Sequence, residues 1–199
     1  MVVMWARAHG GRDCRLYQQP PTWPKSGGDA GRGCQVTHIA MTEASAESEL
    51  DLCLDLIRSA FATVAEERGF TEATVPDHTA YTSRLDLEQL QARGARFFLA
   101  RVDDQPAGCV VLAPGRRADR PTLQKLAVLP AHRQGGIGRT LVQRVIAEAR
   151  LAGAESLGIA IIDDDTRLKA WCEGQGFVEE RTADYPHLPF TVCYLARPV

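Results

Sequence analysis

The stretch that decides the fold is Leu126-Ala127-Val128-Leu129-Pro130-Ala131-His132-Arg133-Gln134-Gly135-Gly136-Ile137-Gly138. An apolar strand runs into Pro130, and a glycine-rich turn then opens an amphipathic helix that extends toward Gly153. The first four N–H groups of a helix lack partners within it, and that end carries about half a positive charge. Because glycine lets a ligand approach the backbone closely, the stretch predicts a pyrophosphate-binding turn, to which Arg133 or Arg139 could add charge.

Two other kinds of phosphate-binding loop are excluded by the same residues. The chain has no G-x-x-x-x-G-K-[ST] pattern, which the P-loop of nucleoside triphosphatases requires. Counting from Gly136, the third glycine position of a dinucleotide-binding fingerprint holds Leu141. The turn also follows several predicted strands instead of opening the fold, so a Rossmann-type site is excluded as well.

The periodicity of apolar residues predicts helices and strands around this turn. A long amphipathic helix is expected from an N-cap at Ser48 to a stop at Gly69. A hairpin is expected over 97–112, with its turn at 103–106, followed by a charged loop over 114–121. Other strands are expected at 36–40, 123–128, 157–162, 177–180 and 190–195, and other helices at 86–93 and 163–173.

The length of 199 residues suits one domain of ordinary size. Residues 1–34 are rich in Pro and Gly and lack periodicity, so we expect a disordered N-terminal tail there. The domain is expected to span 35–199, because a start at Met41 would cut into the strand predicted at 36–40.

Charge and cysteine content narrow the function classes. Residues 1–40 hold five Lys/Arg and two Asp/Glu, a net +3, whereas 41–199 hold eighteen and twenty-three, a net −5. An acidic body argues against nucleic acid as the main partner. No apolar run approaches the roughly 18 residues of a membrane helix, so no membrane partner is expected. The six cysteines form no CxxC pair and no signal-peptide pattern is apparent, which predicts free thiols, no metal site and a cytoplasmic location.

The order of strand, Pro130, Arg133-x-x-Gly136-x-Gly138 and helix resembles the GNAT superfamily of N-acetyltransferases, whose signature is [QR]-x-x-G-x-[GA]. The resemblance covers roughly residues 36–197. It implies an α/β (α+β) fold: a mixed, mostly antiparallel sheet of six to seven strands, about four flanking helices, and a splay between strands 4 and 5. It also implies acetyl-CoA as co-substrate and transfer of the acetyl group to a primary amine by direct attack in a ternary complex.

The resemblance assigns cofactor-binding roles residue by residue. Leu126, Ala127 and Val128 would bind the pantetheine through their backbone, with the Val128 N–H as the expected oxyanion donor. The pyrophosphate would be surrounded by residues of the turn and the start of the helix: Arg133, Gln134, Gly135, Gly136, Ile137, Gly138, Arg139 and Thr140. Asp165, which stands where many relatives carry Asn, completes the expected set.

The segment from Asp165 to Phe177 departs from the family at one chemically important position. Many relatives carry N-x-x-A-x-x-[LW]-Y-x-x-x-G-F, in which the Tyr is the usual general acid for the leaving thiolate. Here Cys172 holds that position. Cys172 could still donate a proton, it could accept the acetyl group as a nucleophile, or it could be a small buried thiol in a site that leaves the thiolate to water.

Two histidines lie in segments that border the acceptor cleft of this fold. His78 and His187 are therefore candidates for binding the acceptor or removing its proton, against the alternative of loop histidines bonded to the backbone. Tyr81 and Tyr185 are alternative acids. Residues 163–165, all Asp, could form a rim for a cationic substrate or a solvated acidic turn.

The acceptor itself is not specified by the sequence, beyond a small-molecule or peptide amine. Other functions are transfer of another acyl group, such as propionyl, an oxygen acceptor, or a catalytically weak acyl-CoA-binding or regulatory module. The last strands support dimers in this family, so a homodimer stays open.

Overall fold

The computed structural model describes residues 39–199, and the predicted tail over 1–34 lies outside them. Seven strands form one sheet in the order β1-β2-β3-β4-β5-β7-β6. The strands are β1 (Ile39–Ala44), β2 (Arg96–Val102), β3 (Gln105–Arg117), β4 (Arg120–Val128), β5 (Ser156–Ile162), β6 (Val178–Ala183) and β7 (Val192–Pro198). The helices are α1 (Glu47–Arg68), α2 (Arg84–Ala92), α3 (Ile137–Leu151) and α4 (Thr166–Gly174), with short 3₁₀ turns η1 (Thr79–Tyr81) and η2 (Pro130–His132).

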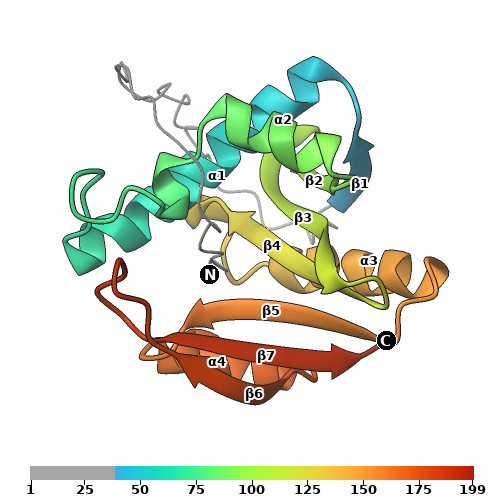
Figure 1. Cartoon of the computed structure of the whole chain (residues 1–199). Helices are drawn as coiled ribbons and strands as arrows, with labels where there is room; N and C mark the ends of the chain where they lie inside the picture. The colour runs from blue at the N-terminus through green and yellow to red at the C-terminus, as the bar shows by residue number, and fades with distance from the viewer. Residues whose placement is uncertain (1–38) are drawn as a thin grey trace.

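Alternating apolar residues give the sheet two buried faces. Along β2, Phe97 and Leu99 contribute to one core with α1 and α2, whereas Phe98 and Ala100 contribute to a second core with α3 and α4. Successive side chains of a strand point to opposite faces, so each continuous apolar strand serves both cores. The result is three layers, with α1 and α2 covering one face and α3 and α4 the other (Figure 1).

The long helix predicted to end at Gly69 does so, with that glycine in the left-handed region at a φ of 65°. The predicted N-cap at Ser48 is wrong, because α1 begins two residues earlier and Ala46 holds the cap position. The Glu49 carboxylate accepts from the backbone N–H groups of Ser45 and Ala46, at 3.2 and 3.4 Å, and so satisfies donors that a Ser cap would leave open.

The charged loop predicted over 114–121 is also wrong. β3 continues to Arg117 and β4 starts at Arg120, so that the hairpin closes on a tight turn. A Cβ at Gly115 would lie 1.8 Å from the carbonyl oxygen of Arg120, so only glycine permits this close approach of the two strands. An exposed ion pair between Arg117 and Asp119 spans the turn, and the pairing of β3 with β4 carries the charged residues into strand ends.

The sheet divides between β4 and β5. All other neighbouring strands are antiparallel, but these two are parallel and pair only at Thr122 and Gly158. Beyond that point they diverge, and Figure 1 shows β1–β4 and β5–β7 as two groups that open away from this contact. The prediction of a mixed sheet of six to seven strands, about four helices and a splay is therefore confirmed, with seven strands and four α-helices among the described residues.

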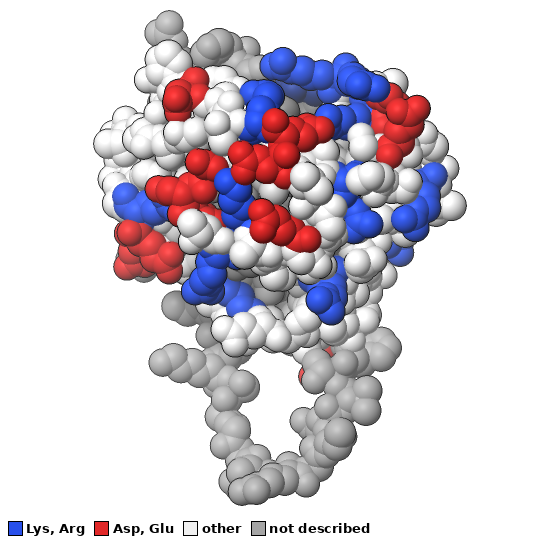
Figure 2. All heavy atoms as spheres, turned by 90° about the horizontal axis from the view of Figure 1, so that it is seen from below, with Lys and Arg blue, Asp and Glu red and all other residues white. Residues whose placement is uncertain are grey.

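On the face seen from below, acidic side chains lie across the middle, with basic side chains between and around them (Figure 2). This face therefore carries charges of both signs. The four cysteines within residues 39–199 are free and buried. No helix among these residues is both long and apolar enough to cross a membrane.

Candidate functional site

A bulge in β4 is the first feature of the site. The register with β3 shifts between Cys109 and Val111, and Lys125, opposite this shift, has a φ of 49° in the left-handed region. The bulge places two consecutive side chains, Gln124 and Lys125, on the α1 and α2 side of the sheet. Alternation then resumes, with Leu126 and Val128 in the α3 and α4 core.

The bulge and the splay together expose one backbone donor. The N–H of Leu129 donates to the carbonyl of Ala107 at 3.0 Å, which makes the neighbouring Gly108 and Val128 a non-hydrogen-bonded pair. The Val128 N–H and C=O therefore point away from β3, toward the side where β5 has separated. This is the geometry of a donor open to a ligand between the strands.

The glycine-rich turn that follows β4 forms an anion cradle. Gln134 and Gly136 both have positive φ, at 67° and 82°, and Gly136 is the N-cap of α3. No side chain caps this end, so the N–H groups at 137–139 have no partner within the helix. A Cβ added at Gly136 would meet nothing within 4 Å, so the space in front of the helix is open. These N–H groups and the helix dipole suit a pyrophosphate.

A groove of about 670 Å³ connects the cradle to the β4 donor. Among the predicted cofactor residues it is lined by Val128, Arg133, Gln134, Gly136, Gly138, Arg139 and Asp165. The side chains of Leu126, Ala127 and Ile137 are buried in the cores, so these residues can offer only backbone to a ligand. Gly135 and Thr140 do not line the groove, and the Thr140 hydroxyl donates to Gly136 O at 3.2 Å.

Arg133 holds the cradle in place. Its guanidinium donates to the carbonyls of Val128 and Ala60, at 3.2 and 3.1 Å, and to the hydroxyl of Thr63 at 2.9 Å. The signature arginine thus ties the end of β4 to α1. Its role in the geometry is to position the turn, and the guanidinium also borders the groove.

Several groove residues were missed from the sequence. Thr63, Val64 and Glu67 lie on α1, and Trp171 on α4. The sequence pattern of α1 did not mark its three residues as ligand-binding, because they lie at the edge of a helix face whose periodicity predicts burial in the core. Trp171 lies within the segment compared with the family pattern and could have been assigned there.

Comparison with known proteins now identifies the family. The model of the acetyltransferase (GNAT) family matches residues 60–177. The chain belongs to the acetyltransferase (GNAT) family. That membership implies the use of an acyl-CoA donor.

Two acetyltransferases are distantly similar to this chain. An amino-acid acetyltransferase of Azotobacter vinelandii is 30% identical over 117 residues, which is 58% of this chain and 26% of that protein. An IAA acetyltransferase of Azospirillum brasilense is 36% identical over 73 residues, 37% of this chain and 48% of that protein. The matches thus span about a quarter and about half of these two relatives.

Solved acetyltransferase structures share the fold. The ribosomal-protein-alanine N-acetyltransferase of Brucella melitensis superposes with a TM-score of 0.61 at 23% identity, over 80% of this chain and 99% of that chain. A GNAT acetyltransferase of Staphylococcus aureus gives 0.61 at 19% identity, over 81% and 99% of the two chains.

Cys172, at the usual tyrosine position of the GNAT pattern, lies in the core. It is 0% exposed, and it packs in the α3 and α4 core and does not line the groove. Burial, followed by the charge of Asp165, raises the pKa of the Cys172 thiol to about 12. A thiol in that environment is a poor proton donor and a poor nucleophile, so the geometry favours the buried structural thiol among the three interpretations.

The acidic turn over 163–165 is engaged in structural contacts. Asp163 pairs with Lys169 at 2.9 Å, and Asp164 with Arg68 of α1 at 2.7 Å. The Asp165 carboxylate caps α4 by accepting from the Leu168 N–H at 2.9 Å. The arrangement therefore fits the interpretation as an acidic turn at a helix start better than a cationic-substrate rim.

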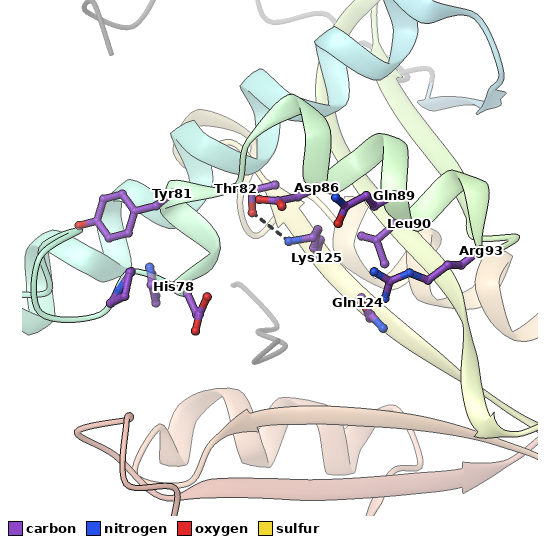
Figure 3. A pocket seen from close by; sticks show the side chains of 11 residues that line it. His78, Tyr81, Thr82, Asp86, Gln89, Leu90, Arg93, Gln124 and Lys125 are labelled. Carbon is purple, nitrogen blue, oxygen red and sulfur yellow. Dashed lines mark hydrogen bonds between the residues drawn. The ribbon is translucent and has the colours of Figure 1, made fainter. Parts of the chain in front are cut away.

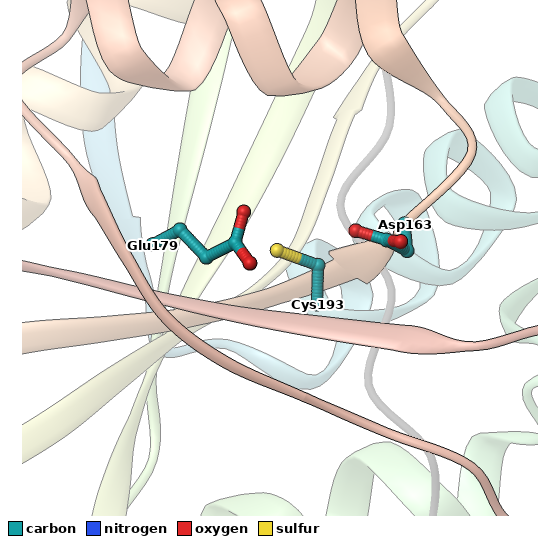
Figure 4. Close-up of side chains that lie close together, drawn as sticks. All are labelled: Asp163, Glu179 and Cys193. Atoms are coloured by element: carbon teal, nitrogen blue, oxygen red, sulfur yellow. The ribbon is translucent and has the colours of Figure 1, made fainter.

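A group of potential metal ligands lies beside this turn. The ligand atoms of Asp163, Glu179 and Cys193 are within 4.8 Å of one another (Figure 4). The Lys169 Nζ lies 2.9 Å from Asp163 and 2.6 Å from Glu179. Because this ammonium already offsets both carboxylates, the group is an ion-pair cluster that joins α4 to β6.

His78 and His187 occupy different surroundings. His78 is buried, caps η1 by accepting from the Ala80 N–H at its Nδ1 (3.2 Å), and lines a second cavity. His187 is exposed in the loop before β7, where its ring lies 5.8 Å from that of Tyr185, and it borders neither cavity. The two histidines are thus not brought together.

The two tyrosines considered as alternative acids both have partners. The Tyr81 hydroxyl donates to Phe70 O at 2.8 Å, and burial raises its pKa. The Tyr185 hydroxyl lies 2.6 Å from that of Tyr194. Tyr81 lines the second cavity, so of the two it is the one placed beside a cavity.

The second cavity, named here the Lys125 cavity, has a volume of about 140 Å³. Its lining comes from the loop before η1, from α2 and from the bulge of β4 (Figure 3). The Lys125 Nζ donates to the Thr82 hydroxyl at 2.9 Å, and Lys125 is only 8% exposed. Sequence reasoning missed this lysine, although two adjacent polar residues inside an apolar strand were visible.

Proposed function

We propose that this chain transfers an acetyl group from acetyl-CoA to an amine by direct attack in a ternary complex. The observation that carries the proposal is the Val128 N–H, which faces the gap between β4 and β5 directly before the cradle of Gly136 and α3. An N–H donor for the thioester carbonyl and a pyrophosphate site on one continuous groove fit the thioester and the pyrophosphate of an acyl-CoA.

In this proposal the chain acts mainly by positioning. The N–H groups at 137–139 hold the pyrophosphate, and the Val128 N–H polarises the thioester carbonyl and stabilises the oxyanion. Losing such a donor typically costs about 2.7–4 kcal/mol. The neutral amine forms the new C–N bond as the C–S bond breaks. One proton leaves the amine nitrogen and one is taken up by the thiolate, so atoms and charge balance.

Proton transfer to the thiolate relies on solvent in this account. Cys172 is buried and its pKa is raised, so it does not supply the proton that a tyrosine supplies in many relatives. General acid catalysis is typically worth about 10²–10⁴-fold, so its absence slows turnover while orientation and the oxyanion donor remain.

The two named relatives are an amino-acid acetyltransferase and an IAA acetyltransferase, which supports an amine or small-molecule acceptor. The test is a thiol-release assay with acetyl-CoA across amino acids, alkylamines, polyamines and N-terminal peptides, with the acetylated product verified by mass spectrometry. We expect one thiol released per acetylated amine. Tight acetyl-CoA binding without any acetylated product across this panel would contradict the proposal.

A catalytically weak acyl-CoA-binding module is the second candidate, and the buried Cys172 is the observation that favours it. The same assay separates the two functions. A module of this kind would bind acetyl-CoA and propionyl-CoA with similar affinity and give no turnover with any acceptor.

A further inference from the structure

The Lys125 cavity contains a buried positive charge that the bulge places there. Lysine is rarely buried unless it is paired, and the left-handed conformation is unfavourable for a residue other than glycine. Without the bulge, strict alternation would turn the side chain of residue 125 into the apolar core that holds Leu123 and Leu126. The strained backbone thus delivers an ammonium group to this cavity.

Unlike Lys125, two side chains of the cavity have polar atoms without partners among the described residues. His78 is 2% exposed and its Nε2 makes no hydrogen bond, whereas Gln124, 3% exposed, leaves unpaired its Oε1, an acceptor that does not itself suit an anion. Because the Nδ1 of His78 accepts from the Ala80 N–H, the ring proton sits on Nε2. This Nε2–H is a buried donor on the wall of the cavity, and a buried donor of this kind calls for an acceptor.

Lys125 is the most deeply buried of the four charged side chains that line the cavity, which favours an anion beside it. Arg93, at the end of α2, lines the same cavity as Lys125. The pKa of His78 is lowered to about 4, first by burial and then by the positive charges of Lys125 and Arg68, so its ring is neutral near pH 7 and remains a donor. Two carboxylates, Asp77 and Asp86, also line the cavity, and Asp86 accepts from the Ser83 N–H at 2.9 Å in the cap of α2.

We infer that the Lys125 cavity binds a carboxylate group of the acceptor, with Lys125 and Arg93 as cations and His78 as hydrogen-bond donor. The acceptor of the proposed transfer, on which this inference rests, is therefore an amine that also carries a carboxylate. Lys125 and Val128 are three residues apart on one strand, so their Cα atoms lie at most about 10 Å apart. The amine and the carboxylate should accordingly be separated by a chain of several atoms.

The test uses matched pairs of acceptors and one charge-removing variant. The acceptors are ω-amino acids from glycine to 6-aminohexanoate, together with lysine and glutamate. Each is compared with the compound in which one carboxylate is converted to a primary amide. That carboxylate is the single one of the ω-amino acids and of lysine, and the side-chain one of glutamate. Thiol release is measured for the wild type, for Lys125→Met, which keeps length without charge, and for Lys125→Arg, which keeps the charge.

We expect the wild type to prefer the acid to its amide by at least tenfold in kcat/KM, with the longer chains best. Lys125→Met should raise KM for the acid at least tenfold and leave KM for the amide and for acetyl-CoA unchanged, and Lys125→Arg should restore part of the difference. Equal activity on acid and amide, a preference for polyamines, or equal losses on both members of a pair would overturn the inference.

Calorimetric titration of 6-aminohexanoate and its amide, with coenzyme A present, separates this inference from the proposed function. Binding of the acid that Lys125→Met weakens, without turnover on any amine, would leave the carboxylate site standing and contradict the transferase. Turnover on amines that carry no carboxylate, without binding of the acid, would support the transferase and contradict the carboxylate site. Absence of both would contradict the carboxylate site and the transferase together.

Discussion

At the scale of single residues, the thiol of Cys172 decides how the leaving group is protonated. Its full burial and raised pKa assign it a packing role. We predict that Cys172→Ala lowers the free energy of unfolding by about 1 kcal/mol and leaves kcat and its pH profile unchanged. Urea denaturation and thiol-release kinetics measure the two effects.

The matched control for that variant is Cys193→Ala, because Cys193 is a second fully buried thiol of the same core. Both variants should behave alike. A tenfold or larger fall in kcat confined to Cys172→Ala, with the fold intact, would restore the acid or nucleophile interpretation.

His78 supplies a pH-dependent contribution to stability. Its pKa in the folded chain is about 4, below the ordinary 6.5, so the unfolded chain binds a proton that the folded chain excludes between these values. The free energy of unfolding should therefore fall as the pH drops from 6.5 toward 4, by at most about 1.4 kcal/mol per pH unit. Denaturation of the wild type and of His78→Gln at pH 7, 5.5 and 4.5 measures this contribution. The slope should be smaller in the variant, and identical slopes would show that another group causes the loss.

At the scale of elements, the cradle depends on a glycine conformation as well as on open space. Gly136 has a φ of 82° and faces the groove. We predict that Gly136→Glu abolishes acetyl-CoA binding, because the side chain and its charge meet the pyrophosphate. Gly153, with a φ of 76° and equally open surroundings beyond the far end of α3, is the matched control.

Gly153→Glu imposes a similar backbone strain without approaching the groove, so it should bind acetyl-CoA like the wild type. Calorimetric titration at equal protein stability checks both variants. Undiminished acetyl-CoA binding by Gly136→Glu, or an equal loss of binding in both variants, would show that the cradle does not bind the pyrophosphate.

Periodicity and turn chemistry predicted the elements that depend on local sequence. α1 stops at Gly69 and α3 begins after the glycine turn, because a left-handed glycine is a local requirement. The strand ends over 114–121 were not predictable in this way, since tertiary pairing overrides the charged composition there. The β4 bulge depends on its pairing with β3, so the direction of the Lys125 side chain could not be derived from its neighbours in sequence.

At the scale of the whole molecule, contacts on the α1 side join the two groups of strands across the splay. The Arg68–Asp164 ion pair links α1 to the turn before α4. The ring of Phe70, after α1, lies 5.5 Å from that of Phe190, before β7. These contacts let β4 and β5 stay apart without the sheet separating. The splay was predicted only through the family resemblance, since hydropathy alone gives strands and not the angle between them.

The most direct test of the account is hydrogen exchange with and without acetyl-CoA. In the free chain, the N–H groups of Val128 and of residues 137–139 have no partner in the sheet or the helix, so they should exchange rapidly. We predict that saturating acetyl-CoA slows exchange at both places by at least about tenfold, while the first-turn amides of α2 at 84–85 are unchanged. Protection at neither place, or at the helix end without Val128, would contradict an acyl-CoA bound in the gap between β4 and β5.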